Sequence, residues 1–243
     1  MLPPLTLQGW LRFDTVERLL VRVEGVRTVL EIGAGVGALG SVLARRYDYL
    51  GLEPDAASYE VGRRRIEAAG GRLEQIPYTE LAPAERFDLV CALEVLEHLS
   101  DDAAALAAWR ELLRPGGRLL ISVPAGQRRF GASDELVGHV RRYERLGLVE
   151  LLLRSGFRDP IVRGYGFPLG NVLKPVRDRL AARRLRAAGD SGTSLSGRWL
   201  QPSNERARLT WAAALPFRYV QRPFAHTELG TGLVALAVKT ESG

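Results

Sequence analysis

One short segment constrains the fold more than any other: an apolar run that ends in a carboxylate and then in regularly spaced glycines, Val29-Leu30-Glu31-Ile32-Gly33-Ala34-Gly35-Val36-Gly37. Apolar residues with helical spacing, Leu39, Val42 and Leu43, come next. This order predicts a parallel strand, a tight loop and the N-terminus of a helix. Glycines let such a loop adopt backbone angles that a Cβ forbids, and they let a ligand approach the backbone. The segment therefore predicts a site for a nucleotide-like ligand.

The glycines alone do not decide which ligand binds. The spacing Gly33-x-Gly35-x-x-Ala38 also fits a loose dinucleotide fingerprint, in which a pyrophosphate lies on the helix N-terminus. The carboxylate of Glu31 would repel phosphates, whereas it suits a ligand that carries an ammonium and a sulfonium. A tight turn without any ligand is the remaining alternative.

A second predicted strand, Tyr49–Leu52, ends in Glu53-Pro54-Asp55. Glu53 follows the glycine loop at about the distance where an acidic residue binds ribose hydroxyls in nucleotide folds. Asp55 is placed to cap a helix that extends through Ala69. The two roles are compatible, with Glu53 binding a ligand and Asp55 capping the helix.

Two more predicted strands carry polar residues at their ends. Phe87–Leu93 runs into the segment Glu94-Val95-Leu96-Glu97-His98, and Arg118–Pro124 forms a further buried strand. A helix is expected to begin at Asp101-Asp102, which serve as a cap and dipole complement, and to close at Leu112–Gly117. We see no convincing metal cluster in this pattern.

These segments together resemble the class I S-adenosylmethionine-dependent methyltransferases. The resemblance covers roughly residues 25–165 and a final strand, and its motifs occur in the family's order and spacing: Glu31–Gly37, Gly51–Asp55, Phe87–Val90, Glu94–His98 and Leu113–Gly117. It implies an α/β fold with a Rossmann-like seven-stranded, mostly parallel sheet, an antiparallel last strand and helices on both faces. It also implies that S-adenosylmethionine is the cofactor and S-adenosylhomocysteine the product.

The family binds its cofactor across the carboxyl ends of strands one, two and four. Carried over to this chain, the cofactor-binding residues are Glu31, Gly33, Ala34, Gly35, Gly37, Glu53, Pro54 and Glu94. One position departs from the pattern, because the usual acidic partner of the adenine amino group is missing after the third strand, at about Arg72–Gln75. Thr79 or a backbone carbonyl is the expected replacement, with Ile76 or Tyr78 packing on the ring.

The loop after the predicted strand Arg118–Pro124 is the expected acceptor side, where the sulfonium methyl must point. His139 is the candidate general base, since imidazole titrates near neutral pH; orienting the loop is its alternative role. Asp134 and His98 are expected to shape the substrate site. Arg141 and Arg142 suit a carboxylate or phosphate. Tyr143 is a catalytic candidate or a packing residue at a helix entry.

The composition agrees with a single domain of 243 residues, with 46% hydrophobic and 26% charged residues. The N-terminal residues do not resemble a signal peptide, and no apolar run approaches about 18 residues. Cys91 lies in a predicted buried strand and is expected to be a core residue rather than a nucleophile. A lone cysteine forms no intrachain disulfide, which fits a cytoplasmic enzyme.

Two segments outside these motifs are expected to cover parts of the domain. Residues 1–24 are predicted as an N-terminal helical cap, with a helix over Arg12–Val23 that closes the cofactor side. Residues 166–231 are predicted as an insertion between the sixth strand, Ile161–Tyr165, and the antiparallel seventh strand, Gly232–Lys239. A segment of this length is typical of a functional cover. Within it we expect helices over Pro175–Ala188 and Arg206–Leu215, the latter ending at Pro216, and a mobile loop over Gly189–Gly197.

Positive charge is concentrated in this insertion. The chain carries a formal charge of +6, whereas Lys174–Arg222 alone contains eleven basic and three acidic residues, a formal charge of +8. A solvated helix face is one interpretation. An anionic acceptor or a peripheral membrane surface is the other. Nucleic acid is disfavoured, because aromatic residues are sparse there and no recognised RNA-binding module is present.

The sequence thus predicts methyl transfer to an oxygen or nitrogen of a small-molecule, biosynthetic acceptor that could be anionic. A lipid-linked, phosphorylated or macromolecular acceptor is the alternative. A nucleotide-dependent oxidoreductase or a non-catalytic binding domain is disfavoured by Glu31 and by the retained glycines and Glu53. An oxidoreductase also lacks support because the chain has only two lysines and no Tyr-x-x-x-Lys pair. The acceptor and the oligomeric state stay open.

Overall fold

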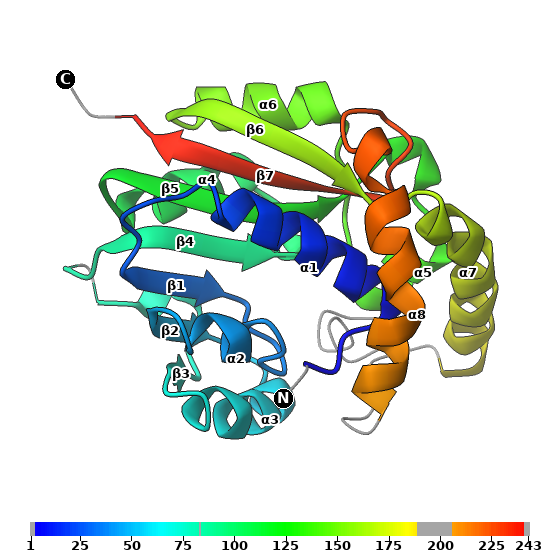
Figure 1. The fold of residues 1–243 in the computed structure, drawn as a ribbon, viewed down its shortest axis with the longest axis horizontal. Coiled ribbons are helices and arrows are strands. Elements are labelled where there is room, and N and C mark those ends of the chain that lie inside the picture. The colour runs from blue at the N-terminus through cyan, green and yellow to red at the C-terminus, as the bar shows by residue number, and fades with distance from the viewer. Residues whose placement is uncertain (1–2, 83, 189–205, 241–243) are drawn as a thin grey trace.

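The computed structural model describes residues 3–82, 84–188 and 206–240, and within them the chain forms one seven-stranded sheet with the strand order β3-β2-β1-β4-β5-β7-β6 (Figure 1). Every pairing of β1 to β5 is parallel, whereas β7 runs antiparallel to both β5 and β6. This confirms the predicted fold class. The strands are Thr28–Ile32 (β1), Asp48–Leu52 (β2), Arg72–Glu74 (β3), Phe87–Leu93 (β4), Leu113–Pro124 (β5), Phe157–Tyr165 (β6) and Gly232–Lys239 (β7).

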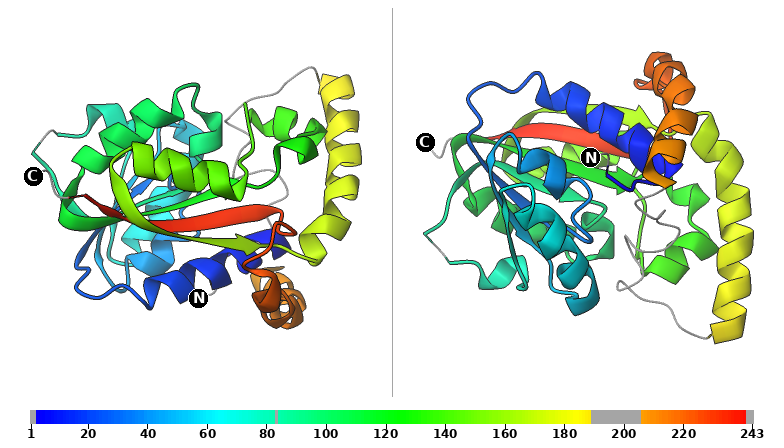
Figure 2. Two further views of the ribbon diagram at one scale, coloured as in Figure 1. Left: turned by 90° about the horizontal axis from the view of Figure 1, so that it is seen from above. Right: turned by 60° about the horizontal axis from the view of Figure 1, so that its bottom comes forward.

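Helices cover both faces of the sheet, with α6 and α1 on opposite sides when the sheet is seen edge-on (Figure 2). The central strands are therefore apolar on both faces, as expected for parallel strands buried under two helical layers. One core packs α4 and α6 on the sheet, and the other packs α1, α2 and α3. The helices are Leu7–Leu20 (α1), Gly40–Leu43 (α2), Ala56–Glu67 (α3), Asp102–Glu111 (α4), Ala132–Val137 (α5), Arg145–Arg154 (α6), Leu169–Ala188 (α7) and Ala207–Val220 (α8).

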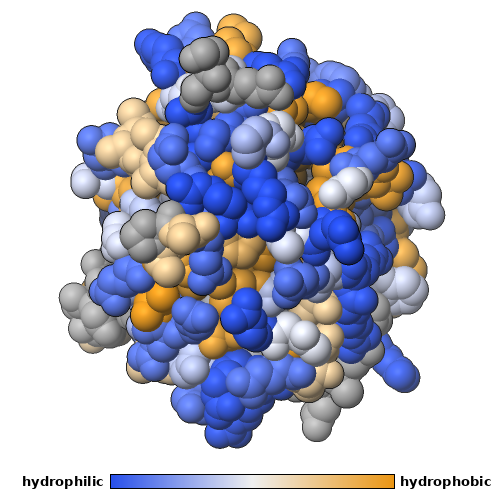
Figure 3. Space-filling model, turned by 90° about the vertical axis from the view of Figure 1, so that its left-hand side faces the viewer, coloured by the Kyte–Doolittle hydropathy of each residue, from blue (hydrophilic) through white to orange (hydrophobic). Residues whose placement is uncertain are grey.

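The two ends of the sheet differ in what they present. The parallel strands point their carboxyl ends toward α5, α7 and α8 (Figure 1). The opposite side of the molecule is dominated by hydrophilic residues with apolar residues scattered among them (Figure 3). None of the helices in the described part of the chain is long and apolar enough to cross a membrane. Glu53 and Glu94, the polar residues that the sequence indicated at strand ends, directly follow β2 and β4. They lie at the carboxyl edge of the sheet because both strands are parallel.

The residues between β6 and β7 contribute α7 and α8, which attach to different parts of the domain (Figure 2). Helix α7 packs on α5, where Asp178 accepts hydrogen bonds from the Ser133 hydroxyl and backbone N–H at 2.5 and 3.2 Å. Helix α8 packs on α1, where the buried Asp14 forms ion pairs with Arg218 and Arg222 at 3.1 and 3.2 Å. The insertion thus fastens to the helix after β5 and to the N-terminal helix.

Several predicted boundaries are wrong: β6 begins at Phe157 rather than Ile161, α7 begins at Leu169 rather than Pro175, and three further boundaries have a visible cause. Helix α1 begins five residues earlier than expected, because the Thr6 hydroxyl caps it by accepting from the Gly9 N–H at 3.0 Å. Helix α4 ends at Glu111 and residues 113–117 belong to β5, which bulges between its pairings with Phe87 and Leu89. Gly116 permits that bulge with a φ of +69°.

Helix α8 does not end at Pro216 but continues to Val220. A proline inside a helix removes one backbone hydrogen bond and crowds the preceding turn. Contacts on either side of Pro216 offset that cost: Ala214 is fully buried, Phe217 packs on the core, and Arg218 binds Asp14. The expected loop Gly189–Gly197 lies outside the described residues.

Candidate functional site

The glycine loop joins β1 to α2, and its three glycines all have positive φ, +70° at Gly33, +55° at Gly35 and +70° at Gly37. A Cβ on Gly33 would lie 2.7 Å from the Val95 side chain, and one on Gly37 would lie 2.9 Å from the Gly62 carbonyl oxygen. A Cβ on Gly35 would meet nothing within 4 Å. Gly33 and Gly37 are therefore required for packing, whereas Gly35 presents bare backbone to open space.

Glu53 lies at the end of β2, 7% exposed, and holds this loop in place. Its Oε2 accepts from the Gly35 N–H at 2.7 Å, and its Oε1 accepts from the Asp55 N–H at 2.9 Å. Asp55 in turn caps α3 by accepting from the Ser58 N–H at 2.9 Å, which confirms its predicted capping role. An ionised carboxylate has about four acceptor positions, so Glu53 can bind further donors such as ribose hydroxyls. The neighbouring Pro54 is exposed.

Glu31 lies below the loop rather than on its surface. Its side chain is buried in β1, and its Oε2 accepts from the Tyr49 hydroxyl at 2.5 Å. Burial raises the pKa of Glu31 to about 7, although the Tyr49 hydroxyl and the charge of Arg12 oppose that rise. Ala34 is also buried, and its N–H donates to the Leu52 carbonyl at 3.0 Å. Both residues shape the floor of the loop.

The expected adenine region follows β3. Ile76 and Tyr78 are partly buried against the core, and the Tyr78 ring meets the Trp109 ring edge-on with centroids 5.9 Å apart. Thr79 is exposed in the single turn Tyr78–Glu80. Its proposed contact with adenine stays a prediction.

Glu94 directly follows β4 and is held by groups from three other elements. Its φ is +58°, a left-handed conformation that is uncommon for a residue with a side chain. Its Oε1 accepts from the hydroxyls of Ser122 at 2.9 Å and Tyr165 at 3.1 Å, and it forms an ion pair with Arg12 at 3.4 Å. Burial alone would raise the pKa of Glu94, but Arg12, His139 and these hydrogen bonds hold it below its ordinary value.

Arg12 is a site residue that the sequence did not reveal. It lies on α1 and forms an ion pair with Glu94, which is 82 residues further along the chain. No local motif marks it, since it is one arginine among many. The prediction that the N-terminal helix adjoins the cofactor side was the only available signal.

A cluster of imidazoles and carboxylates lies beside Glu94. The His139 Nδ1 lies 2.9 Å from Asp134 Oδ1, and its Nε2 lies 3.6 Å from Glu97 Oε1. Burial alone would raise the pKa of Asp134, but hydrogen bonds from His139 and Arg142 lower it to about 2. Because ionised Asp134 only accepts, the Nδ1 of His139 carries a proton, and in the neutral ring Nε2 is the atom with the lone pair.

His98 completes the cluster from the turn after β4. Its ring lies 4.7 Å from the His139 ring, centroid to centroid, and its Nδ1 donates to the Gly138 carbonyl at 3.1 Å. Burial, and secondarily the charge of His139, lowers the pKa of His98 to about 4. His98 is therefore neutral at physiological pH. Glu97, next to it, is fully buried, and burial together with the charge of Glu94 raises its pKa well above its ordinary value.

The remaining polar residues of the loop after β5 bind the protein itself. Arg141 forms an ion pair with Asp102 at 2.7 Å, and Arg142 is buried against Asp134 at 2.8 Å. The Tyr143 hydroxyl donates to Asp102 Oδ2 at 3.0 Å, and its ring lies in the core. This geometry favours packing for Tyr143 and loop positioning for both arginines over direct roles toward a substrate. Asp134 likewise has no exposed oxygen to offer a substrate, since its side chain is 2% exposed.

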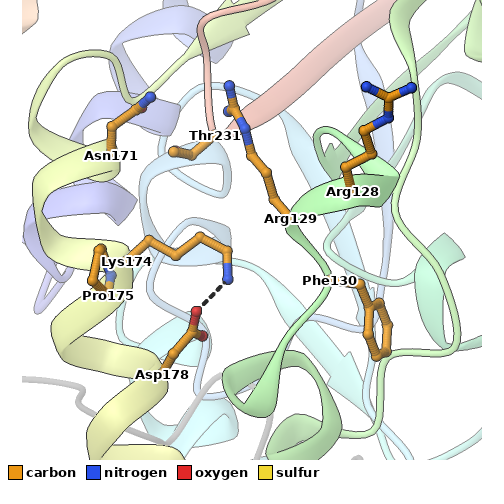
Figure 4. A pocket seen from close by; sticks show the side chains of 8 residues that line it. All are labelled: Arg128, Arg129, Phe130, Asn171, Lys174, Pro175, Asp178 and Thr231. Carbon is orange, nitrogen blue, oxygen red and sulfur yellow. Dashed lines mark hydrogen bonds and ion pairs between the residues drawn. The ribbon is translucent and has the colours of Figure 1, made fainter.

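A cavity of about 410 Å³ opens between α7 and the loop after β5 (Figure 4). The side chain of Lys174 extends across it and binds Asp178 at 2.6 Å, while Arg129 points toward Thr231. Arg129 also donates to the Gly230 carbonyl at 2.6 Å. The lining contains three cations and one carboxylate: Arg128, Arg129, Phe130, Asn171, Lys174, Pro175, Asp178 and Thr231.

Comparison with known proteins places this geometry in a family. The sequence model of a methyltransferase domain matches residues 10–159, well over half of the chain. The ubiquinone biosynthesis O-methyltransferase of Alkalilimnicola ehrlichii is 38% identical over 120 residues, which cover 46% of this chain and 47% of that protein. That of Cereibacter sphaeroides is 40% identical over 103 residues, 41% of each chain. The chain thus spans about half the length of the curated relatives it matches.

Solved structures share the fold over nearly the whole chain. An S-adenosylmethionine-dependent methyltransferase of Thermotoga maritima aligns with a TM-score of 0.61 and 16% identity, over 96% of this chain and 91% of that one. The N-methyltransferase NodS of Bradyrhizobium japonicum, solved with S-adenosylhomocysteine, aligns with a TM-score of 0.56 and 16% identity, over 95% and 86%. At such identity these structures establish the fold alone. Together with the domain match and the glycine loop, they show that the chain belongs to the class I S-adenosylmethionine-dependent methyltransferase family.

Proposed function

We propose that this protein transfers the methyl group of S-adenosylmethionine to an oxygen or nitrogen of a small-molecule acceptor. The observation that carries the proposal is a juxtaposition at one sheet edge. The glycine loop with Glu53 and Glu94 lies at the carboxyl ends of β1, β2 and β4, and the imidazole of His139 lies beside Glu94. A cofactor site thus adjoins a group that can act on an acceptor.

Within this site we assign each residue a role toward the cofactor. The open backbone at Gly35 and the carboxylate of Glu53 bind the ribose, and Gly33 and Gly37 shape the loop. Arg12 and Glu94 lie at the methionine end, where the cofactor carries a carboxylate and an ammonium. Arg12 suits the carboxylate, and Glu94 suits the ammonium.

The reaction makes modest demands on the protein. The acceptor attacks the methyl carbon, a new oxygen–carbon or nitrogen–carbon bond forms, and the carbon–sulfur bond breaks with its electrons passing to a neutral thioether. Alignment of the three atoms can supply much of the acceleration. A hydroxyl acceptor must also lose a proton, and His139 acts on it through Nε2, the ring atom that carries the lone pair.

The curated relatives favour oxygen as the acceptor atom. They are named as O-methyltransferases of ubiquinone biosynthesis, and the matched segments amount to less than half of this chain. We propose an oxygen acceptor by that likeness, with nitrogen as the alternative. A cytoplasmic location, which the single cysteine favours, belongs to the same proposal.

Titration calorimetry tests the cofactor assignment. We expect S-adenosylmethionine and S-adenosylhomocysteine to bind with 1:1 stoichiometry, because the carboxylates of Glu53 and Glu94 suit a cationic ligand. NADH, whose pyrophosphate these carboxylates repel, should not bind. Binding of NADH without binding of either sulfur compound would contradict the proposed function.

A second candidate acceptor is anionic or linked to a lipid surface. Its support is the outer face of α7, where Val172, Val176 and Leu180 recur every fourth residue and are exposed, Val172 by 69%. Four exposed arginines, Arg179, Arg183, Arg184 and Arg186, lie on the same helix. Apolar residues beside arginines suit an anionic interface. The cationic cavity under α7 offers such an acceptor a place close to the loop after β5.

Removing charge from α7 tests this candidate. The triple substitution of Arg183, Arg184 and Arg186 by Gln should weaken binding to vesicles that contain anionic lipid, and binding by the native protein should fall as salt rises. Exposed charges are screened over about 8–10 Å near physiological ionic strength. Affinity for S-adenosylhomocysteine should not change. The matched control replaces Arg45, Arg64 and Arg154, which are exposed away from the insertion. Equal vesicle binding by both variants would identify the α7 arginines as a solvated face.

A further inference from the structure

The carboxylate of Glu97 is fully buried, and neither of its oxygens has a hydrogen-bond partner. The nearest ring nitrogen is His139 Nε2, 3.6 Å from Glu97 Oε1, which is too long for a hydrogen bond. A buried carboxylate without donors is costly to maintain, so native structures rarely leave one without a ligand. A cation bound to Glu97 would displace the carboxyl proton and give its two oxygens the partner that the described residues do not supply.

In the neutral form of each neighbouring imidazole, Nδ1 carries the proton and Nε2 carries the lone pair. His139 donates its Nδ1–H to Asp134, and His98 donates its Nδ1–H to the Gly138 carbonyl. In the neutral rings Nε2 is then the atom that can bind a metal. One ligand atom from each of Glu97, His98 and His139 lies within 4.8 Å of the other two.

We propose that Glu97, His98 and His139 form a binding site for a divalent transition-metal ion on the acceptor side of the methyltransferase site. Two imidazoles and one carboxylate are a ligand set used by zinc and by other first-row metals, and they leave coordination positions open. The 3.6 Å between Glu97 Oε1 and His139 Nε2 suits two ligands that each lie about 2.0–2.2 Å from one ion.

The surroundings of the cluster fit a metal site. Asp134 accepts from the far nitrogen of His139 and is itself fixed by Arg142, the arrangement by which proteins orient a metal-binding histidine. The Gly138 carbonyl orients His98 in the same way. The cluster joins the turn after β4 to the loop after β5, so an ion there would tie together the two segments nearest the acceptor.

This inference rests on the proposed function and narrows its substrate class. With an ion bound, His139 Nε2 would be a metal ligand and not the general base; the ion would instead bind the acceptor hydroxyl at an open position and make its proton more acidic. The site therefore favours acceptors that present a hydroxyl, with or without a second oxygen for chelation. Sequence spacing did not reveal the cluster, because Glu97 and His98 are adjacent whereas His139 lies on a different loop.

Metal titration of the full chain tests the site directly. Protein stripped with a chelator is titrated by calorimetry with Zn²⁺ and Mn²⁺ separately, and Co²⁺ is used as a spectroscopic probe. We expect 1:1 binding of at least one of these ions and a Co²⁺ absorption band that reports imidazole ligands. Glu97→Gln and His139→Ala should each weaken the affinity at least tenfold. The third histidine of the chain, His226, is exposed, and His226→Ala should bind like the native protein.

A second pair of variants guards against misfolding. His98→Ala removes a partly exposed ligand, and Asp134→Asn, which acts through His139, should weaken metal binding by about 10–100-fold. The site is refuted if no ion binds the native protein more tightly than it binds these variants, or if His226→Ala alone abolishes binding. Titration of metal-free protein with S-adenosylhomocysteine separates the two proposals. If S-adenosylhomocysteine binds but no metal ion does, only the metal site is refuted. If a metal ion binds but S-adenosylhomocysteine does not, the proposed function is refuted.

Discussion

Replacing His139 by Ala is expected to lower turnover by about 10²–10⁴-fold while leaving the affinity for S-adenosylhomocysteine within a fewfold of the native value. The reason is the position of the ring: Asp134 fixes its Nδ1–H, and Nε2 faces Glu97 on the acceptor side of Glu94. Loss of a group that handles the acceptor proton costs rate in this range. Steady-state kinetics at saturating cofactor and acceptor, together with calorimetry, measure the two quantities.

The control for this substitution is His226→Ala, which removes an exposed imidazole outside the cluster. It should retain native turnover. Asp134→Asn provides a graded comparison, because it leaves the His139 ring in place but loses the charge that fixes its tautomer. A His139→Ala enzyme with near-native turnover and an unchanged pH–rate profile would show that the ring only orients the loop.

The sheet could be predicted from the sequence because its strands are locally encoded. Central parallel strands are buried on both faces and appear as continuous apolar runs, as in Phe87–Leu93. The glycine loop is equally local, since the positive φ values at Gly33, Gly35 and Gly37 demand glycine whatever the rest of the chain does. Capping by Asp55 and Asp101 also depends on only a few neighbouring residues.

The site beyond the loop could not be predicted in the same way, because its geometry depends on distant partners. Arg141 and Arg142 are chemically suited to a phosphate, yet Asp102 and Asp134 bind them. The pairing of Arg12 with Glu94 spans two elements that only the folded sheet brings together. Helix α8 continues past Pro216 for a related reason, since contacts with α1 outweigh the local signal to stop.

Glu53 combines both kinds of information: its spacing behind the loop is visible in the sequence, and its partners are visible only in the structure. Its two oxygens already accept from Gly35 and Asp55, so the carboxylate is fixed before any ligand binds. A fixed acceptor loses little entropy when it binds a ribose, which strengthens each hydrogen bond to the cofactor. The side chain is thus both a brace for the loop and a proposed ligand-binding group.

Glu53→Ala is accordingly expected to weaken S-adenosylmethionine binding by about 1.5–3 kcal/mol, the range for hydrogen bonds to a charged group, or roughly 10- to 150-fold in Kd. Far-UV circular dichroism should match the native spectrum, since the substitution removes only the two loop hydrogen bonds to Gly35 and Asp55 and leaves the sheet pairings intact. The affinity of Glu53→Gln for S-adenosylmethionine should lie between that of the native protein and that of Glu53→Ala, because the amide keeps one acceptor oxygen. Glu60→Ala removes an exposed carboxylate from the adjoining helix α3 and should bind the cofactor normally. Native affinity for Glu53→Ala in titration calorimetry would exclude Glu53 from the cofactor site, leaving it the role of bracing the loop at Gly35.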